Sequence, residues 1–132
     1  MNFQTSKPKS ESRKEDIKLQ HQKLSNYAKY FLEKSNRETI EVEHGFVSYE
    51  IMGERVHVYD MWVNPDFRSK GIGHELMEMV INHAKNSLCT ILTANVQLGI
   101  NDCEKSLMAQ LKYGFKIYSA NQKEINLIKE II

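Results

Sequence analysis

The chain has 132 residues, of which 41% are hydrophobic, so it is long enough for one cored domain and too short for two independent ones. Its 18 lysines and arginines against 17 aspartates and glutamates give a net charge of +1, which excludes a global field that would gather nucleic acid or an anionic membrane. No apolar run approaches the roughly 18 residues of a membrane span, and the first residues lack the apolar centre of a signal peptide.

The two cysteines, Cys89 and Cys103, stand apart, with no CxxC motif and no paired histidines. This pattern fits neither a zinc site nor a disulfide framework, and it favours a reducing compartment. We therefore expect a cytoplasmic protein without a bound metal.

Residues 1–11 are polar and cannot bury enough apolar surface to order themselves, so we expect a flexible tail ahead of one domain over residues 12–132. Ser12 and Glu15 have the spacing of a capping box, which marks the start of a helix. Apolar residues behind them recur at helical spacing and predict a helix over about 13–34. These residues are Ile17, Leu24, Tyr27, Ala28, Phe31 and Leu32.

Residues 39–63 have the composition and alternation of strands. Segments 45–51 and 56–63 are predicted to form a hairpin that turns through residues 52–55. In the second segment, Val56 and Val58 alternate with His57 and Tyr59, which is the period of a half-buried strand.

The run Trp62–Met77 joins this strand to a helix, and Pro65 marks the end of the strand. The helix is predicted from a single apolar stripe at helical spacing. The stripe consists of Leu76, Met77, Val80, Ile81 and Ala84.

The rest of the chain predicts a strand over 89–98, a helix over 101–113, and an antiparallel pair over 115–121 and 124–131 that turns near Asn121. The predicted order is helix, two strands, helix, strand, helix, two strands. Helices and strands alternate too closely for separate domains, so we expect a single α/β (α+β) domain with one mixed sheet and helices on its faces.

The junction itself suggests anion binding. A helix N-terminus presents unpaired N–H groups and about half a positive charge. Arg68 and Lys70 add cations, while Gly71 and Gly73 lack the Cβ atoms that would block a diphosphate. A tight connection with two solvated cations is the alternative that these residues leave open. A Walker loop and the dinucleotide fingerprint are excluded, because there is no GKS or GKT and no third glycine.

These residues resemble the signature of the GNAT superfamily of acyl-CoA-dependent N-acetyltransferases: Arg or Gln, two residues, Gly, one residue, then Gly or Ala. The matching positions, with their flanking residues, are Val63, Pro65, Arg68, Gly71, Gly73 and Leu76. Residues 104–115 resemble the second motif of the family, a short helix that ends in Gly-Phe. The predicted element order from residue 38 onward also agrees with the family fold, and the compact format resembles small virus-encoded members.

The resemblance implies a mostly antiparallel sheet with helices on both faces, in which segments 56–63 and 89–96 splay apart and hold acetyl-CoA as co-substrate. The end of the first segment would bind the pantetheine arm and thioester through the backbone of Met61, Trp62 and Val63. Backbone amides of the loop would hold the pyrophosphate, and Asn101 lies near a position where the family often supplies a cofactor contact. The loop residues are Arg68, Ser69, Lys70, Gly71, Ile72, Gly73 and His74.

Acetyl transfer to an amine needs a neutral amine, since a free lysine has a pKa near 10.4, as well as a polarised carbonyl. A backbone N–H near Val63 is a candidate for polarising the carbonyl. The resemblance places the base at His57, with Tyr59 next on the same face. A cross-strand structural role for His57 stays open, and Asp60 and Glu50 are the nearest alternative bases.

The usual general acid of the family is a tyrosine, and Gln110 stands at that position. Glutamine cannot protonate a thiolate usefully, although its amide could hydrogen-bond the sulfur or orient a water. Protonation by solvent, protonation by a shifted tyrosine such as Tyr59, and weak activity are the alternatives that stay open. Tyr113 lies three residues along the helix from Gln110 and is expected to face elsewhere.

Several alternatives follow. Gln110 favours a noncatalytic acyl-CoA-binding module with the same fold. The run His74–Glu78 has part of the HExxH pattern of a metal hydrolase, but no third ligand is apparent. The expected acceptor is a protein lysine, an N-terminus or a small amine. No first strand precedes the helix at residue 13, so the acceptor side is expected to be open or completed by a homodimer.

Overall fold

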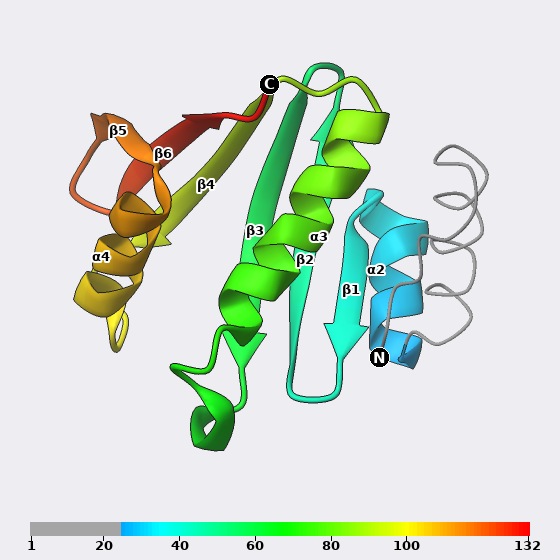
Figure 1. Cartoon of the computed structure of the whole chain (residues 1–132), viewed down its shortest axis with the longest axis horizontal. Helices are drawn as coiled ribbons and strands as arrows, with labels where there is room; N and C mark the ends of the chain where they lie inside the picture. Colours follow the sequence, from blue (N-terminus) through cyan, green and yellow to red (C-terminus); the bar gives the residue numbers. More distant parts are fainter. Residues whose placement is uncertain (1–24) are drawn as a thin grey trace.

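A computed structural model describes residues 25–132 (Figure 1). The elements follow one another along the chain as α2 (Asn26–Ser35), β1 (Glu38–Val42), β2 (Gly45–Met52), β3 (Arg55–Val63), the 3₁₀ helix η1 (Pro65–Phe67), α3 (Ile72–Asn86), β4 (Ile91–Gln97), α4 (Cys103–Tyr113), β5 (Lys116–Ala120) and β6 (Glu124–Glu130).

The strands form one six-stranded sheet in the order β1-β2-β3-β4-β6-β5. Within the described residues, β3 and β4 are the parallel pair, and the other neighbours are antiparallel. The parallel pairing extends only from Arg55↔Ile91 to His57↔Thr93. Beyond these residues the two strands diverge, as Figure 1 shows. The predicted α+β domain with a mixed, mostly antiparallel and splayed sheet is therefore confirmed.

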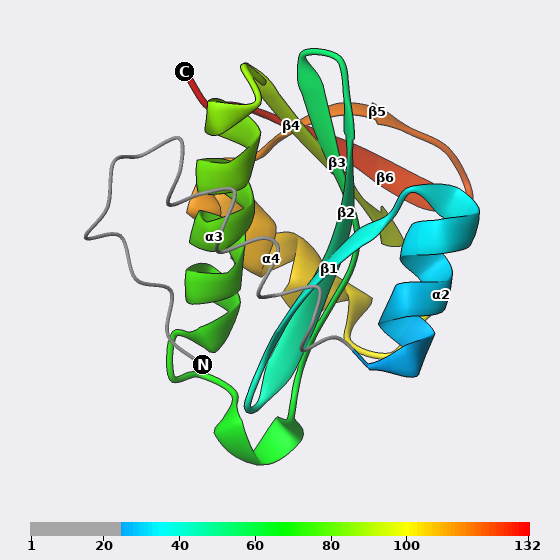
Figure 2. The same ribbon diagram turned by 90° about the vertical axis from the view of Figure 1, so that its right-hand side faces the viewer.

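Helices cover both faces of the sheet (Figure 2). Helix α3 packs across β2 and β3, and α2 lies against β1 on the opposite face. The buried residues of α3 are those of the apolar stripe predicted from the sequence, namely Leu76, Met77, Val80, Ile81 and Ala84. They meet fully buried side chains of the strands, including Val56 of β3 and Leu92 of β4. This shared core holds the half of the sheet formed by β1, β2 and β3 against the half formed by β4, β6 and β5, at the end where β3 and β4 are still paired.

Two predictions of element boundaries are wrong. Three strands precede α3 instead of two, because β1 forms a separate hairpin with β2 that ends at Val42↔Gly45. A continuous helix over 13–34 is also wrong. The backbone of Ser25 is extended at ψ 162°, and its side chain caps α2 by accepting from the Ala28 N–H at 3.1 Å.

The remaining predictions of elements agree with the structure. Strand β4, helix α4 and the β5–β6 pair lie within the ranges expected for them. Asn121 turns the final pair, since its Oδ1 accepts from the N–H groups of Lys123 and Glu124. The proposed tail over residues 1–11 and the capping box of Ser12 and Glu15 lie outside the described residues.

Candidate active site

The loop between β3 and α3 is shaped to receive an anion. Ser69 and Gly71 both have positive φ, at 64° and 87°, so the backbone curves tightly before the first turn of α3. Gly71 is the N-cap of α3, and it offers no side chain to the amides of that turn. The helix therefore presents N–H groups and its positive end at this point.

The second glycine, Gly73, lies beside the end of β3. A Cβ at Gly73 would lie 3.5 Å from Sδ of Met61, which is an ordinary contact distance. The first turn of α3 is thus in contact with the end of β3, and the loop and the strand form one continuous surface.

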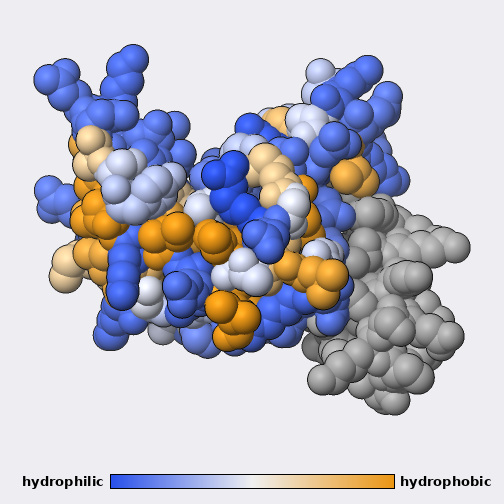
Figure 3. All heavy atoms as spheres, turned by 90° about the horizontal axis from the view of Figure 1, so that it is seen from above, coloured by the Kyte–Doolittle hydropathy of each residue, from blue (hydrophilic) through white to orange (hydrophobic). Residues whose placement is uncertain are grey.

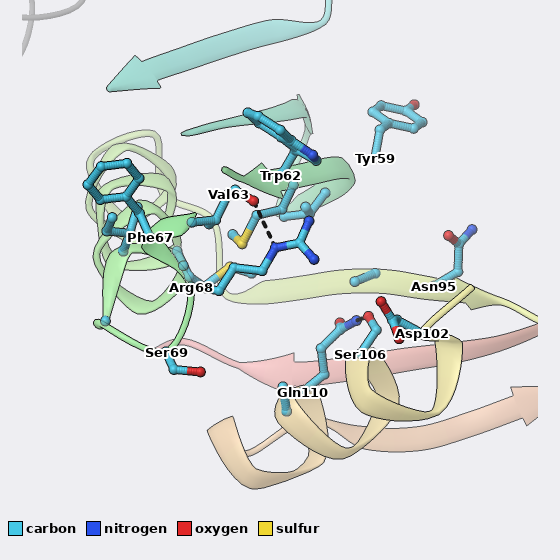
Figure 4. Close-up of a pocket in the computed structure, with 18 of the residues that line it drawn as sticks. Tyr59, Trp62, Val63, Phe67, Arg68, Ser69, Asn95, Asp102, Ser106 and Gln110 are labelled. Atoms are coloured by element: carbon cyan, nitrogen blue, oxygen red, sulfur yellow. Dashed lines mark hydrogen bonds between the residues drawn. The ribbon is translucent and has the colours of Figure 1, made fainter. Parts of the chain in front are cut away.

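That surface borders a cavity of about 490 Å³. Its walls come from β3, the loop, the start of α3, the middle of β4 and one face of α4 (Figure 4). Seen from above, the molecule also has a hollow between its left and right parts (Figure 3). The cavity lies where the strands diverge, because no neighbouring strand fills that space.

Most residues predicted for the site line this cavity. They are Tyr59, Met61, Trp62, Val63, Arg68, Ser69, Gly71, Ile72, Gly73, Asn101 and Gln110. His57, Lys70 and His74 lie outside the lining. The ammonium of Lys70 lies 5.2 Å from the centre of the Phe67 ring, and the His74 ring packs edge-on against Tyr113.

A β-bulge at Tyr59 sets the direction of the side chains on β3. Asp60 pairs with Ser48 of β2, and Val58 pairs with the next residue, Tyr49, so Tyr59 has no partner on β2. Val56 and Val58 are buried before the bulge, whereas Met61 and Val63 pack against the core after it. The extra residue therefore changes the inward-facing positions from even to odd numbers.

Arg68 lines the cavity while its side chain is still exposed to solvent. Its Nε donates to the carbonyl oxygen of Val63 at 2.8 Å, and Figure 4 shows the guanidinium between the end of β3 and α4. This contact places a permanent positive charge beside the end of β3.

A polar group of side chains lies where β3 and β4 begin to diverge. The Tyr59 hydroxyl donates to Glu50 at 2.9 Å, and the Arg37 guanidinium lies 3.7 Å from the centre of the Tyr59 ring. Burial raises the pKa of Tyr59, and the hydrogen bond to Glu50 raises it further.

His57 lies beside this group, with its Nδ1 2.7 Å from the Thr93 hydroxyl. Burial lowers the pKa of His57, and the charges of Arg55 and Arg37 lower it further, so the ring is neutral at pH 7.

Three polar residues of the lining were missed from the sequence. Asn95 of β4 donates from Nδ2 to Glu124 at 3.0 Å, and an amide between the apolar residues Ala94 and Val96 was its signal. Asp102 and Ser106 line the cavity together with Gln110. Their spacing of four residues, which puts them on one helix face, could have identified them.

The environment of Gln110 and Tyr113 matches the expectation from the sequence. Gln110 donates to the Ser106 hydroxyl at 3.2 Å, whereas the Tyr113 hydroxyl donates to Glu78 of α3 and does not line the cavity. Burial, followed by the bond to Glu78, raises the pKa of Tyr113. Tyr113 is therefore not placed to act in place of the tyrosine that the family usually has at the position of Gln110.

The hydrolase alternative has no support in the described residues. Residues 25–132 bring together no three histidine, cysteine, aspartate or glutamate side chains that could hold a metal ion. His74 and Glu78 both contact Tyr113 instead.

None of the helices in residues 25–132 is long and apolar enough to cross a membrane.

The fold and the site define an α+β protein whose sheet splits beside a glycine-containing loop at a helix N-terminus. The model of the acetyltransferase (GNAT) family matches residues 3–113, so the chain belongs to that family, a class of acyltransferases. The resemblance in the sequence is thereby confirmed. No curated protein is similar enough to this chain to count as a match.

Solved structures share the fold at low sequence identity. PaiA N-acetyltransferase from Thermoplasma acidophilum, in complex with coenzyme A, is 17% identical with a TM-score of 0.60, and the match covers 66% of this chain and 53% of that one. A GNAT family acetyltransferase from Elizabethkingia anophelis with acetyl-CoA bound is 19% identical with a TM-score of 0.62, over 98% and 94% of the two chains. Naa50 from Arabidopsis thaliana, in complex with the bisubstrate analogue CoA-Ac-MVNAL, is 21% identical with a TM-score of 0.54, and the match covers 65% of this chain and 64% of that one. This chain thus spans about half the length of PaiA and less than two thirds of Naa50.

Proposed function

We propose that the protein is an N-acetyltransferase that moves the acetyl group of acetyl-CoA to a primary amine by direct attack in a ternary complex. The observation that carries this proposal is the single cavity bordered both by the uncapped glycine loop of α3 and by the diverging end of β3. Family membership and the CoA-bound structures of similar fold support the same choice of co-substrate.

In this proposal the pyrophosphate lies on the backbone amides from Arg68 to His74, at the positive end of α3. The pantetheine arm extends along Met61, Trp62 and Val63. Within the described residues, β3 has no partner on β4 beyond His57, so its edge groups there can pair with the amides of the arm. Lys70 and His74 contribute through their backbone only, which agrees with side chains that contact Phe67 and Tyr113. Asn101 lines the same cavity and supplies a further polar contact.

The reaction begins when a neutral amine attacks the thioester carbonyl carbon. A backbone N–H near Val63 stabilises the oxyanion of the tetrahedral intermediate. The intermediate then releases the thiolate as the C–S bond breaks. His57 accepts the proton that the attacking nitrogen loses. The proton passes through a water, because the His57 side chain lies just outside the cavity lining. Its lowered pKa keeps the ring unprotonated at neutral pH.

The thiolate also needs a proton. Tyr59 lines the cavity, and a tyrosine hydroxyl is protonated at neutral pH, so it is our candidate for the proton donor. Gln110 is placed to hydrogen-bond the sulfur or to orient a water. The same glutamine is the observation that favours the second candidate function, a noncatalytic acyl-CoA-binding or interaction module with this fold.

The proposal extends to the setting of the protein. The acceptor is a protein lysine, an N-terminus or a small amine, and a homodimer is one way to complete its binding site. Cys89 and Cys103 are free thiols, which suits a cytoplasmic location. We also keep the division into a tail over residues 1–11 and one domain over residues 12–132 as part of the proposal.

The test is an acetylation assay with acetyl-CoA and a panel of peptides and small amines, read out by mass spectrometry of the product and by release of free CoA thiol. We expect turnover with at least one amine and a loss of about a hundredfold or more in kcat for His57→Gln. The variant should bind CoA as the wild type does, which serves as its folding control. Tight CoA binding without turnover of any amine would contradict the enzymatic proposal and support the noncatalytic one.

A further inference from the structure

We propose that Thr93 is a positioning residue that fixes the tautomer of His57, so that Nε2 is the nitrogen that accepts a proton. The inference rests on the proposed function, in which His57 is the base. Thr93 lies on β4, outside every motif that the sequence displays, and 36 positions from His57 in the chain.

The two residues form the last rung of the parallel pairing. His57 and Thr93 are Cα partners at the end of the β3–β4 ladder, and the strands diverge immediately beyond them. The next residue on each strand, Val58 and Ala94, already lines the cavity. The contact between the two side chains therefore lies at the apex of the wedge that receives the cofactor in our proposal.

The positions of the hydrogens follow from two contacts of one hydroxyl. The Thr93 Oγ1 lies 2.7 Å from Nδ1 of His57 and 3.5 Å from the carbonyl oxygen of Val56. A threonine hydroxyl has one hydrogen to donate and lone pairs to accept with. If it donates to Val56, its oxygen accepts from Nδ1–H of His57 and both contacts become hydrogen bonds. If it donates to Nδ1, the Val56 carbonyl loses this contact, which at 3.5 Å is a weak one, so the first arrangement is favoured because it satisfies both.

The first arrangement leaves the lone pair of His57 on Nε2, on the opposite side of the ring from Thr93. Thr93 is 4% exposed, so water does not compete for its hydroxyl, and the orientation is held by the protein. The Tyr59 ring lies edge-on at 4.8 Å and limits rotation of the imidazole from the other side. The base is thus oriented before the acceptor arrives.

Charged groups around the ring come from several elements. Arg55 on the same strand and Arg37 after α2 disfavour the imidazolium, whereas Glu50 of β2 and Glu124 of β6 favour it. None of these four is removed when Thr93 is changed, so a substitution at Thr93 tests the hydrogen bond apart from the surrounding charge.

The experiment compares the wild type with Thr93→Ser, which keeps the hydroxyl, and Thr93→Val, which keeps the shape without it. Proton–nitrogen correlation NMR of the histidine side chains reads the tautomer of His57 directly, with His57→Gln used for assignment. We expect Nδ1–H with unprotonated Nε2 in the wild type and in Thr93→Ser, and a shift toward the other tautomer in Thr93→Val.

Kinetics give the second readout. Thr93→Val should lose about tenfold or more in kcat and change the acidic limb of the pH profile, whereas Thr93→Ser should stay within about threefold. A wild-type His57 protonated on Nε2 would overturn the inference, as would a Thr93→Val variant with unchanged kcat and pH profile. If no amine is acetylated, the proposed function fails and the catalytic part of the inference fails with it, while the NMR spectra still decide the hydrogen bond.

Discussion

The Glu38 carboxyl lies at the start of β1, with 21% of its side chain exposed and one oxygen 3.4 Å from Nδ1 of His83 on α3. Burial raises its pKa to about 7 from an ordinary value of 4.5. The folded state therefore favours the protonated form. The stabilisation from this group is fully present below about pH 4.5 and is lost as the pH rises through about 7.

Glu38→Gln removes this titration and keeps a neutral side chain of the same size. We expect the free energy of unfolding of the variant, relative to that of the wild type, to be about 1 to 3 kcal/mol larger at pH 8 than at pH 5, which means a relatively more stable variant at pH 8. Urea denaturation at both pH values measures it, with Glu54→Gln in the exposed β2–β3 turn as the control. A difference that does not change with pH would contradict the assigned cause.

At the residue scale, the sequence predicted most where one short segment contains the whole feature. Gly71, Gly73 and Arg68 lie within six positions, and the structure places all three in the lining of one cavity at the start of α3, while anion binding there stays a prediction. The contact between His57 and Thr93 joins residues that only the fold brings together, and the sequence contains no local signal for it. The assignment of His57 to the site was possible only through the resemblance to the family.

Among the elements, α3 was predicted almost completely because its apolar stripe repeats over several turns. The bulge at Tyr59 could not be predicted, because it depends on the register between β3 and β2 and not on either strand alone. The break at Ser25 was missed for a different reason. Its neighbours continue the helical spacing of apolar residues, whereas the cap depends on a single side chain.

Helix α4 ends at Gly114, which has φ 117° and donates its N–H to the carbonyl oxygens of Gln110 and Leu111. A Cβ at this position would lie 2.9 Å from Nζ of Lys129, which is the end of a flexible side chain and can move, so the cost of a substitution comes mainly from the positive φ. This turn sets the angle between α4, which lines the cavity, and the β5–β6 pair.

We expect Gly114→Ala to reduce the free energy of unfolding by about 1 to 3 kcal/mol. Gly53→Ala is the matched control, because the φ of Gly53 is 62°, within the left-handed region that other residues can adopt, and a Cβ there would meet nothing within 4 Å. Chemical denaturation of both variants measures the difference. A smaller loss for Gly114→Ala than for Gly53→Ala would show that the end of α4 is not constrained as described.

At the scale of the whole molecule, one core supports a sheet that is continuous at one end and divided at the other. Leu92 of β4 and Leu127 of β6 are fully buried with Val56 of β3, so both halves share apolar contacts behind the wedge. The cavity therefore results from the topology, in which a short parallel pair separates two antiparallel groups of strands. The sequence predicted the mixed sheet, but the depth of the cavity and the arrangement of its polar walls required the structure.

The central claim is that this wedge binds acetyl-CoA with its pyrophosphate on the first turn of α3. Calorimetric titration with CoA and acetyl-CoA tests it, using the wild type, Gly73→Asp and Gly73→Ala. An aspartate in the first turn of a helix favours folding, while its charge repels a diphosphate. The alanine adds only a contact with Met61 at ordinary distance.

We predict a dissociation constant between about 1 µM and 1 mM for the wild type and for Gly73→Ala, and at least about tenfold weaker binding for Gly73→Asp. Equal binding by all three proteins, or no binding by a folded wild type at millimolar cofactor, would contradict the account.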